Sequence, residues 1–465
     1  MPAFDACTLA RWSAGRWTVK PTGPVTGFAI DSRQLRAGDA FVALRTDRRD
    51  GHDYLAAAAE KGAVAAIVEC PIPGPLPQLV VADPLRAFQA IAREHRLAFP
   101  GRVIGITGSA GKTSTKHLLA QLLGPAALAT EGNLNNHLGV PLTLTRLDPS
   151  VHQFAVIEAG ISEPGEMAVL AGMIEPDAAI VTLVAAAHTQ DLGGIEGVAR
   201  EKAVLAAAVR AEGVAFLPRS VAGHEVFRRL QARLEVVDRV DAASTSAPDA
   251  GAIRFGVAHD QDRTYLEVRI HDEPPLVLTL PRMSDGMAQN AVLAVAAARW
   301  LGVAPEQVQE RLAQWAPPPL RGEVRRTTSQ LLYLDCYNAN PASMRDALAA
   351  FDGIAPSGQP RLYVIGCMEE LGAEAARYHR ELGQSLQLRP RDHACIIGSE
   401  ADAVRAGAIE AGARPEQVDT CVVLAPIVER LAGFRGAVFV KGSRKYRLEE
   451  ILVGTGHAPA TLGAH

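Results

Sequence analysis

The chain has 465 residues, more than one hydrophobic core usually serves, so two or three domains are expected. Hydrophobic residues make up 48% and charged residues 21%, which is typical of a globular protein with a large core. The formal net charge of −4 excludes a general attraction for nucleic acid or for an anionic membrane surface.

The N-terminal segment, MPAFDACTLARW, lacks the basic start and the long apolar run of a signal peptide. No stretch approaches the roughly 18 uncharged apolar residues of a membrane helix. Six cysteines are scattered without paired spacing, which indicates neither a zinc site nor a disulfide framework. We therefore expect a cytoplasmic protein without membrane insertion.

Residues 1–83 are expected to form a small α/β domain. Short β-like runs lie at 25–30, 40–44, 64–68 and 79–81, with a helical segment at 54–61 among them. The polar cluster Asp31, Ser32 and Arg33 follows the first of these runs. Its spacing fits a solvated turn as well as a ligand contact. A helix over 85–98 is predicted to lead into the next domain.

A glycine loop, GITGSAGKTST at 105–115, lies between a strand-like run at 102–104 and a helical segment at 116–123. In such a loop, backbone N–H groups and the helix N-terminus hold the phosphates of a nucleotide. Lys112 is predicted to reach the β- and γ-phosphates, and the Thr113 hydroxyl to hold Mg²⁺. The general pattern expects a glycine at position 106, which is Ile106 here, so a structural glycine turn is the alternative. The predicted nucleotide-binding residues of the loop are Gly108, Ser109, Ala110, Gly111, Lys112, Thr113 and Ser114.

Polar groups are predicted to gather beside this loop. The segment 130–141 is dense in amides and hydroxyls, and its predicted substrate contacts are Asn133, Asn135 and Asn136. Strand-like runs at 154–157 and 179–184 are followed by Glu158 and His188, respectively. Because the carboxyl ends of parallel strands share one edge of a sheet, these two side chains are predicted to converge on one cation.

Three helices complete the second predicted domain, which spans residues 84–315. They are predicted at 196–209, 290–301 and 305–315. Lys202 lies in the first of them, where a lysine is usually a solvated charge, so its position alone does not single it out.

The third predicted domain, residues 316–465, begins at the proline run 317–319. Strands expected at 331–334, 362–365, 394–397, 421–424 and 438–440 alternate with helices, which favours a doubly wound fold without the dinucleotide fingerprint. Polar loops follow the first and last strands, and they contain Asp335, Asn340, Lys441, Ser443 and Arg444. Two such loops at one sheet edge indicate a second substrate or a moving half of the site.

Together these segments resemble the Mur ligases, the ATP-dependent amino-acid-adding enzymes of peptidoglycan synthesis. The resemblance covers nearly the whole chain. It rests on DSR, GDAFVAL and DGHDYL in the first domain, on GITGSAGKTSTK, GNLNNHLGVP and VIEAGISEPGEM in the second, and on LRGE, DCYNANPASM, IGCMEELG and VKGSR beyond. The phosphate loop is shared with folylpolyglutamate synthetases, whereas DCYNANPASM, MEELG and KGSR are more specific.

The resemblance implies an α/β fold of three domains that joins D-alanyl-D-alanine to UDP-N-acetylmuramoyl-tripeptide. In this reaction the terminal carboxylate of the tripeptide attacks the γ-phosphate of ATP, and the dipeptide amine then displaces phosphate from the acyl phosphate. It also implies two Mg²⁺ ions and a carbamate formed from CO₂ on Lys202. We expect a monomer.

The resemblance assigns roles to individual residues. The implied catalytic residues are Lys112, Glu158, His188 and Lys202, and the implied metal ligands are Thr113, Glu158, His188 and the carbamate of Lys202. Asn290 matches an adenine contact, Arg321 a γ-phosphate contact, and Asp335 and Asn340 a loop at the nucleoside. Asp31, Ser32 and Arg33 match the region that holds UDP. Lys441, Ser443 and Arg444 are expected to face the incoming dipeptide.

Several positions depart from the family pattern. Gly286 and Met287 stand where the family usually has His-Asn, Cys367 where Asp is usual, Val204 where Glu commonly follows the lysine, and Arg45-Thr46 where Lys-Gly is usual. Two alternatives therefore stay open. One is another ligase of the superfamily with a different amino acid or polyglutamate as product, and the other is a nucleotide-binding paralogue with weakened catalysis.

Overall fold

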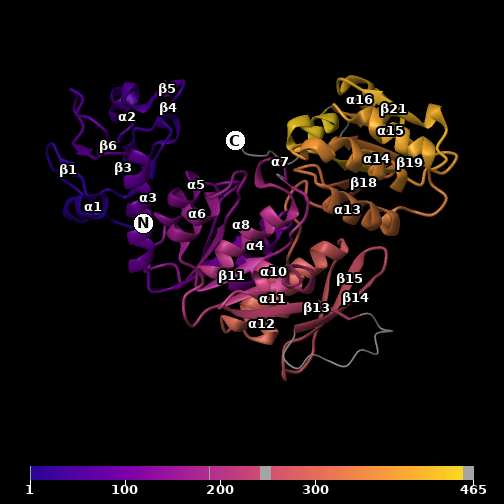
Figure 1. Ribbon diagram of the computed structural model, residues 1–465, viewed down its shortest axis with the longest axis horizontal. Coiled ribbons are helices and arrows are strands. Elements are labelled where there is room, and N and C mark those ends of the chain that lie inside the picture. The colour runs from indigo at the N-terminus through magenta and orange to yellow at the C-terminus, as the bar shows by residue number, and fades with distance from the viewer. Residues whose placement is uncertain (1, 188, 241–252, 454–465) are drawn as a thin grey trace.

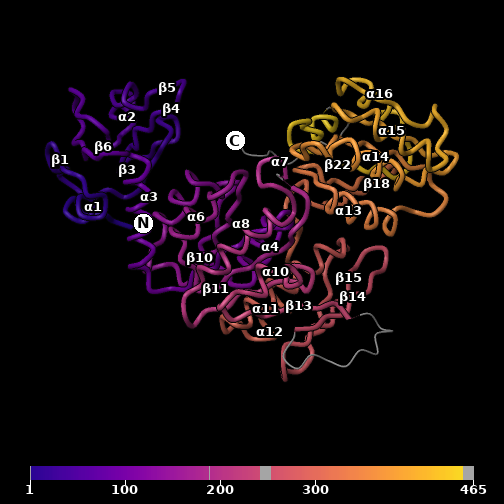
Figure 2. Tube along the Cα trace, viewed as in Figure 1, coloured from indigo at the N-terminus to yellow at the C-terminus, as the bar shows by residue number. Residues whose placement is uncertain are grey.

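The computed structural model describes residues 2–187, 189–240 and 253–453. It is an α/β protein with three main sheets, each mostly parallel, and Figure 1 shows where their labelled strands and helices lie. The trace in Figure 2 passes from an N-terminal sheet through a central sheet to a C-terminal sheet, with the first and last at opposite ends of the long axis. The predicted fold class is confirmed, whereas the predicted domain boundaries stay predictions.

The N-terminal sheet has five short strands in the order β1-β7-β6-β3-β2. They are Arg16–Trp17 (β1), Gly27–Ala29 (β2), Asp39–Val42 (β3), Ala65–Val68 (β6) and Gln78–Val80 (β7). A separate hairpin pairs Arg45–Thr46 (β4) with Arg49–Asp50 (β5). The helices Ala6–Ser13 (α1) and Leu55–Glu60 (α2) complete this part of the chain.

A helix at Pro84–Ala98 (α3) joins the N-terminal sheet to the central sheet. Phe88 belongs to the core of the N-terminal sheet, and Ala92, one turn later, belongs to the core of the central sheet. Arg96 is fully buried, and its guanidinium donates to Oδ2 of Asp177 at 2.8 Å. One helix is therefore packed into two cores.

The central sheet has nine strands in the order β16-β15-β14-β13-β12-β11-β8-β10-β9. They are Arg102–Thr107 (β8), Ala127–Ala129 (β9), Phe154–Glu158 (β10), Ala178–Val181 (β11), Val214–Pro218 (β12), Arg233–Arg239 (β13), Ile253–His259 (β14), Arg263–Arg269 (β15) and Leu276–Pro281 (β16). β8 to β14 pair in parallel, and β15 and β16 add an antiparallel edge.

Helices cover both faces of the central sheet. One core contains residues of Lys112–Leu123 (α4), Asp285–Trp300 (α11) and Pro305–Ala313 (α12). The other contains residues of Gly139–Leu144 (α5), Glu166–Ile174 (α6) and Ile195–Ala207 (α8). α11 begins five residues before the predicted start because the Ser284 side chain caps it by accepting the N–H of Met287. Shorter helices lie at Thr189–Leu192 (α7), Arg219–Ala222 (α9) and Glu225–Arg228 (α10).

The C-terminal sheet has six strands in the order β17-β18-β22-β19-β20-β21. They are Glu323–Arg326 (β17), Gln330–Leu334 (β18), Arg361–Gly366 (β19), His393–Ile397 (β20), Val418–Cys421 (β21) and Gly436–Lys441 (β22). Its helices are Pro341–Ile354 (α13), Ala375–Ser385 (α14), Ala401–Glu410 (α15) and Ala425–Gly433 (α16). The strand predicted at 421–424 was wrong, because β21 ends at Cys421 and Val422 is 95% exposed.

None of the helices in the described ranges is both long enough and apolar enough to cross a membrane.

Candidate active site

A cavity of about 650 Å³ lies between loops of the central sheet and loops of the C-terminal sheet. Most of the predicted site residues line it. They are Ser109, Ala110, Gly111, Lys112, Thr113, Ser114, Asn133, Asn135, Asn136, Glu158, Asn290, Arg321, Asp335, Asn340, Lys441 and Arg444. The fold thus brings together residues from two sheets that are more than 300 positions apart in the chain.

The phosphate loop connects β8 to α4 and depends on two glycines. Gly111 caps α4 with φ +83°, and a Cβ there would lie 2.3 Å from Nδ2 of Asn290. A Cβ on Gly108 would lie 1.9 Å from Oγ1 of Thr182. Both positions therefore require glycine, and Asn290 of α11 packs directly on the loop, where an adenine contact was predicted.

The segment after β11 holds the loop in shape. Thr182 donates through Oγ1 to the carbonyl of Ala110 at 2.5 Å. The N–H of Ser109 donates to the carbonyl of Leu183 at 2.8 Å, and its hydroxyl donates to the carbonyl of Ala185 at 3.0 Å. Thr182 was not predicted, and its only signal in the sequence is a polar residue directly after a buried strand.

Lys112 folds back over its own loop. Its ammonium donates to the carbonyl of Gly108 at 2.8 Å. Burial lowers the pKa of Lys112, and the carboxylate of Glu158 acts in the opposite direction. No carboxylate in the described ranges forms an ion pair with Lys112, so its charge is available to an anion held by the loop.

A buried carboxylate lies beside the loop at the end of β10. Oε1 of Glu158 accepts hydrogen bonds from the Thr113 hydroxyl at 3.2 Å and from the Asn135 amide at 2.8 Å. Oε2 lies 3.2 Å from Nζ of Lys116, and both side chains are nearly fully buried. Burial alone raises the pKa of Glu158, but Lys116 and Lys112 outweigh it and leave this pKa below its usual value. Glu158 is therefore ionised at neutral pH.

The donors around Glu158 fit a magnesium ion. Thr113 supplies a hydroxyl and Glu158 a carboxylate, and Mg²⁺ prefers such oxygen ligands. Oε2 of Glu158 already lies 3.2 Å from the ammonium of Lys116, so the carboxylate would reach a metal ion through Oε1, which faces the Thr113 hydroxyl.

Lys202 lies on α8 and is only 3% exposed. The expectation that its side chain is solvated, as for most helix lysines, was therefore wrong. It does not line the cavity. Its ammonium forms no hydrogen bond or ion pair with the described residues. Burial lowers the pKa of Lys202 well below the usual lysine value, and the nearby charge of Lys112 lowers it further. His188, the other predicted ligand on this side, lies outside the described residues.

Asn340 connects the C-terminal sheet to the phosphate loop. Its Nδ2 donates to the carbonyl of Ser109 at 3.1 Å, while its Oδ1 caps α13 by accepting the N–H of Ser343 at 2.9 Å. Arg321 lies with its guanidinium 4.1 Å from the ring centre of Tyr337, and Arg444 lies 5.7 Å from the same ring. Two arginines therefore face the cavity from this side, and Tyr337 was not predicted.

Three polar residues at the end of β22 and just after it, Lys441, Ser443 and Arg444, have different partners and different exposure. Lys441 is 1% exposed, and its ammonium donates to Asp335 at 2.5 Å and to the carbonyl of Asn338 at 3.2 Å. Ser443 does not line the cavity, and its hydroxyl accepts the N–H of Glu369 at 3.1 Å. Of the three residues predicted to face a dipeptide, Arg444 is the one that combines cavity lining with a partly exposed charge, although it pairs with Glu449.

Asp31, Ser32 and Arg33 lie at the start of a short 3-10 helix that follows β2 of the N-terminal sheet, and they do not line the cavity. Asp31 accepts the N–H of Arg33 at 2.9 Å, and the Arg33 guanidinium, 79% exposed, pairs with the same carboxylate. Gly108 is also absent from the cavity wall, because it is turned toward Thr182.

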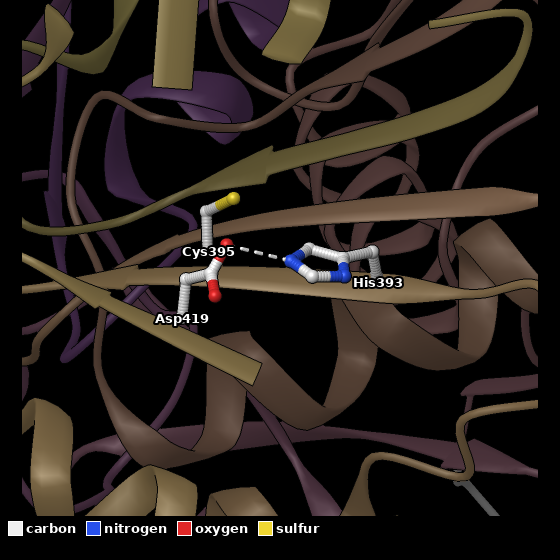
Figure 3. Close-up of side chains that lie close together, drawn as sticks. All are labelled: His393, Cys395 and Asp419. Atoms are coloured by element: carbon white, nitrogen blue, oxygen red, sulfur yellow. Dashed lines mark hydrogen bonds and ion pairs between the residues drawn. The ribbon is translucent and has the colours of Figure 1, made fainter. Parts of the chain in front are cut away.

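A second polar cluster lies on the C-terminal sheet and is drawn in Figure 3. His393 and Cys395 of β20 and Asp419 of β21 bring possible metal ligands within 4.8 Å of one another. Nε2 of His393 lies 2.8 Å from Oδ2 of Asp419, and the Arg430 guanidinium lies 2.6 Å from the same oxygen. Because an arginine already neutralises this carboxylate, the cluster is a hydrogen-bonded ion pair at a sheet edge.

Known proteins resemble this chain over most of its length. Models of the Mur ligase family catalytic domain, the Mur ligase middle domain and the Mur ligase glutamate ligase domain match residues 24–92, 106–298 and 320–444. The UDP-N-acetylmuramoyl-tripeptide--D-alanyl-D-alanine ligase of Escherichia coli (strain K12) is 32% identical over 91% of this chain and 92% of that protein.

Solved structures give the same result. The crystal structure of MurF from Acinetobacter baumannii has a TM-score of 0.85 at 27% identity, covering 98% of this chain and 99% of that one. The MurF ligase from Thermotoga maritima, crystallised with ADP, has a TM-score of 0.78 at 26% identity, covering 93% and 98%.

Proposed function

Because this chain belongs to the Mur ligase family, we propose that it joins D-alanyl-D-alanine to UDP-N-acetylmuramoyl-tripeptide at the expense of ATP. The observation that carries the proposal is the single cavity shared by the phosphate loop, the buried carboxylate of Glu158 and the arginines of the C-terminal sheet. Relatives that carry the name of this ligase match nine-tenths of the chain.

The reaction couples two anions and an amine. The terminal carboxylate of the tripeptide attacks the γ-phosphorus of ATP, the bond to the β-phosphate oxygen breaks, and ADP leaves. The dipeptide amine then attacks the acyl carbon, loses a proton, and displaces inorganic phosphate, which leaves an amide. Both attacking partners carry or approach negative charge, so neutralisation and positioning supply most of the catalysis.

The chain's own cations suit this task. Lys112, held over the phosphate loop and not paired with any carboxylate in the described part of the chain, is the group we assign to the β- and γ-phosphates. Arg321 reaches the cavity from the C-terminal sheet and is assigned to the γ-phosphate. Asn340 ties that sheet to the loop, so closing the cavity aligns both cations on one phosphate chain.

Two magnesium ions are part of the proposal. Thr113 and Glu158 are the oxygen donors that would hold them, with His188 and a modified Lys202 as the further ligands the family resemblance implies. Bound Mg²⁺ would neutralise the phosphate oxygens as charge develops on them. Asn135 orients the carboxylate of Glu158 toward this position.

The carbamate on Lys202 is a further part of the proposal. CO₂ reacts with a neutral amine, releases a proton and leaves a carboxylate-like carbamate. Burial lowers the pKa of Lys202 well below the usual value, so its amine is neutral at a pH where an exposed lysine is not. A mass increase equal to CO₂ on the peptide that contains Lys202 would support the assignment, and turnover by Lys202→Ala at the parent rate without bicarbonate would overturn it.

The remaining assignments concern the two peptide substrates. Asp31, Ser32 and Arg33, at the start of the short 3-10 helix after β2, are proposed to hold UDP. Asn133 and Asn136 are proposed to contact the peptide on its way to the cavity, and Arg444 is proposed to attract the dipeptide carboxylate. Because UDP-linked precursors and ATP are cytoplasmic compounds, we propose a cytoplasmic location. We also propose that the chain acts as a monomer.

A ligation assay tests the function. The purified chain is incubated with ATP, Mg²⁺, bicarbonate and UDP-N-acetylmuramoyl-tripeptide carrying either diaminopimelate or lysine. D-Alanyl-D-alanine, D-alanine and glutamate are compared as acceptor amines, and phosphate release and product mass are measured. We expect release only with D-alanyl-D-alanine. Release that ignores this dipeptide would favour another ligase of the superfamily, and nucleotide binding without release would favour the paralogue with weakened catalysis.

A further inference from the structure

One carboxylate of the cavity wall interacts electrostatically with Arg282 but forms no ion pair with it or with any other described residue. Asp346 of α13 lines the cavity and forms no ion pair with the described residues. Its Oδ1 accepts the N–H of Gly286 at 2.9 Å, and the hydroxyl of Ser284 also bonds to the carboxylate. A carboxylate has about four acceptor positions, so it retains capacity for a further donor.

The surroundings make an unpaired charge here unfavourable. Burial raises the pKa of Asp346, and the neighbouring Asp335 and Asp285 raise it further, against the two hydrogen bonds that lower it. A desolvated carboxylate near other carboxylates is costly unless a donor satisfies it. Because the side chain faces a ligand cavity, a ligand is the natural source of that donor.

Asp346 lies on the same side of the cavity as Asn290, the residue to which the family resemblance assigns an adenine contact. Asn290, which packs on Gly111 of the phosphate loop, is four residues after Gly286 on α11. Asp346 therefore lies about one helical turn beyond the loop. A Cβ on Gly286 would lie 2.6 Å from Oδ2 of Asp346, so glycine at this position is what allows the carboxylate to approach.

The wall around Asp346 suits a flat base. The apolar side chain of Met287 on α11 lines the same cavity, and the buried Tyr333 of β18, whose ring packs on Phe439 and Phe351, borders it as well. We propose that Asp346 accepts a hydrogen bond from the exocyclic 6-amino group of adenine and thereby selects ATP among purine nucleotides. This inference rests on the proposed ATP-dependent function. Because Asp346 is carried by the C-terminal sheet, it also makes base recognition depend on the docking of that sheet.

Binding of three nucleotides to the full chain tests the assignment. The probes are ATP, purine riboside triphosphate, which lacks the 6-amino group, and 2′-deoxyATP, each with Mg²⁺. The dissociation constants are measured for the parent, for Asp346→Ala and Asp346→Asn, and for Asp352→Ala. Asp352 is the matched control, an exposed aspartate on the same helix that does not line the cavity.

We expect the parent and the control to bind ATP about tenfold or more tightly than purine riboside triphosphate, since a hydrogen bond to a charged group is worth at least that ratio. The ratio is expected to fall to about one in Asp346→Ala. Asp346→Asn keeps an acceptor oxygen and the helix contacts, so it is expected to keep part of the ratio and to melt like the parent.

An unchanged ratio in Asp346→Ala, with all nucleotides weakened equally, would overturn the proposal and leave Asp346 as a docking residue. A loss confined to the preference for ATP over 2′-deoxyATP would also overturn it, because the ribose would then be the donor. These readouts need no ligation, so a chain that discriminates between the nucleotides but releases no phosphate would contradict the proposed function and not this inference.

Discussion

Replacing Lys116 by methionine tests how the buried carboxylate is held. The substitution keeps the length of the side chain but removes the cation 3.2 Å from Oε2 of Glu158 and the hydrogen bond to the carbonyl of Gly132. Breaking a buried pair by removing one partner costs about 3–5 kcal/mol. Lys112 and Arg321 still attract the carboxylate. We therefore expect a loss near the lower end, about 3 kcal/mol of unfolding free energy.

Urea unfolding at pH 7 measures this loss, and two comparisons identify its cause. Glu158→Gln removes the charge that needs a cation, so the double variant is expected to recover about 1.5–3 kcal/mol relative to the sum of the single losses. Lys445→Met breaks an exposed pair of similar length, 3.1 Å from Glu369, and is expected to cost about 1 kcal/mol or less.

The pH dependence has a definite sign. Lys116 and Lys112 hold the pKa of Glu158 below its usual value, so the stability that the pair contributes is present above the unfolded pKa of about 4.3 and is lost as the pH falls. The difference between parent and Lys116→Met is therefore expected to stay nearly constant from pH 7 to about pH 5 and to shrink as the pH falls below about 4.3. Additive losses in the double variant, or equal losses at Lys116 and Lys445, would refute the reasoning.

Three further predictions follow from local geometry. Gly111 and Gly165 both cap helices at φ +83°, but nothing lies within 4 Å of a Cβ on Gly165. Gly165→Ala is therefore expected to cost only about 1–2 kcal/mol in a melting experiment, whereas Gly111→Ala should also lose ATP binding; equal effects would contradict this. Asn340→Asp keeps the cap of α13 but loses the donor to the phosphate loop, so it should retain stability and weaken ATP binding, while Asn340→Ala should lose about 1 kcal/mol of stability as well. Burial lowers the pKa of Lys202, so a protonated Lys202 destabilises the folded state. In bicarbonate-free buffer, Lys202→Met should therefore raise the melting temperature at pH 7, and this gain should fade toward pH 10.4, about the pKa of an unfolded lysine. A gain that does not change with pH would contradict the lowered pKa of Lys202.

Local signals explain what the sequence could predict. The phosphate loop is contiguous, and its glycines, lysine and threonine are each required by backbone geometry or by charge, so a pattern in eleven residues was sufficient. Glu158 was predictable because it ends a buried strand of a parallel sheet, whose carboxyl edge is shared with the loop. Lys202 was ambiguous, because its burial depends on how α8 packs on the sheet.

Distant contacts explain the rest. Asp346 looks like an ordinary helix charge until α13 meets α11, and Thr182 acquires its role from a carbonyl 72 positions away. The strand predicted at 421–424 failed because apolar residues there form an exposed turn, and no local pattern distinguishes an apolar turn from an edge strand. The strands β14 to β16 were also missed, although β15 and β16 alternate buried and exposed residues and pair with their neighbours in consecutive hairpins.

The helix α3 has a mechanical consequence. Phe88 and Ala92 are anchored in different cores, and Arg96 is bound to carbonyls and a carboxylate of the central layer. A rotation of the N-terminal sheet relative to the central sheet would have to break the buried Arg96–Asp177 ion pair and separate apolar contacts in both cores. We therefore expect the N-terminal and central sheets to move together as one rigid body. The segment before β17 is then the hinge about which the C-terminal sheet rotates.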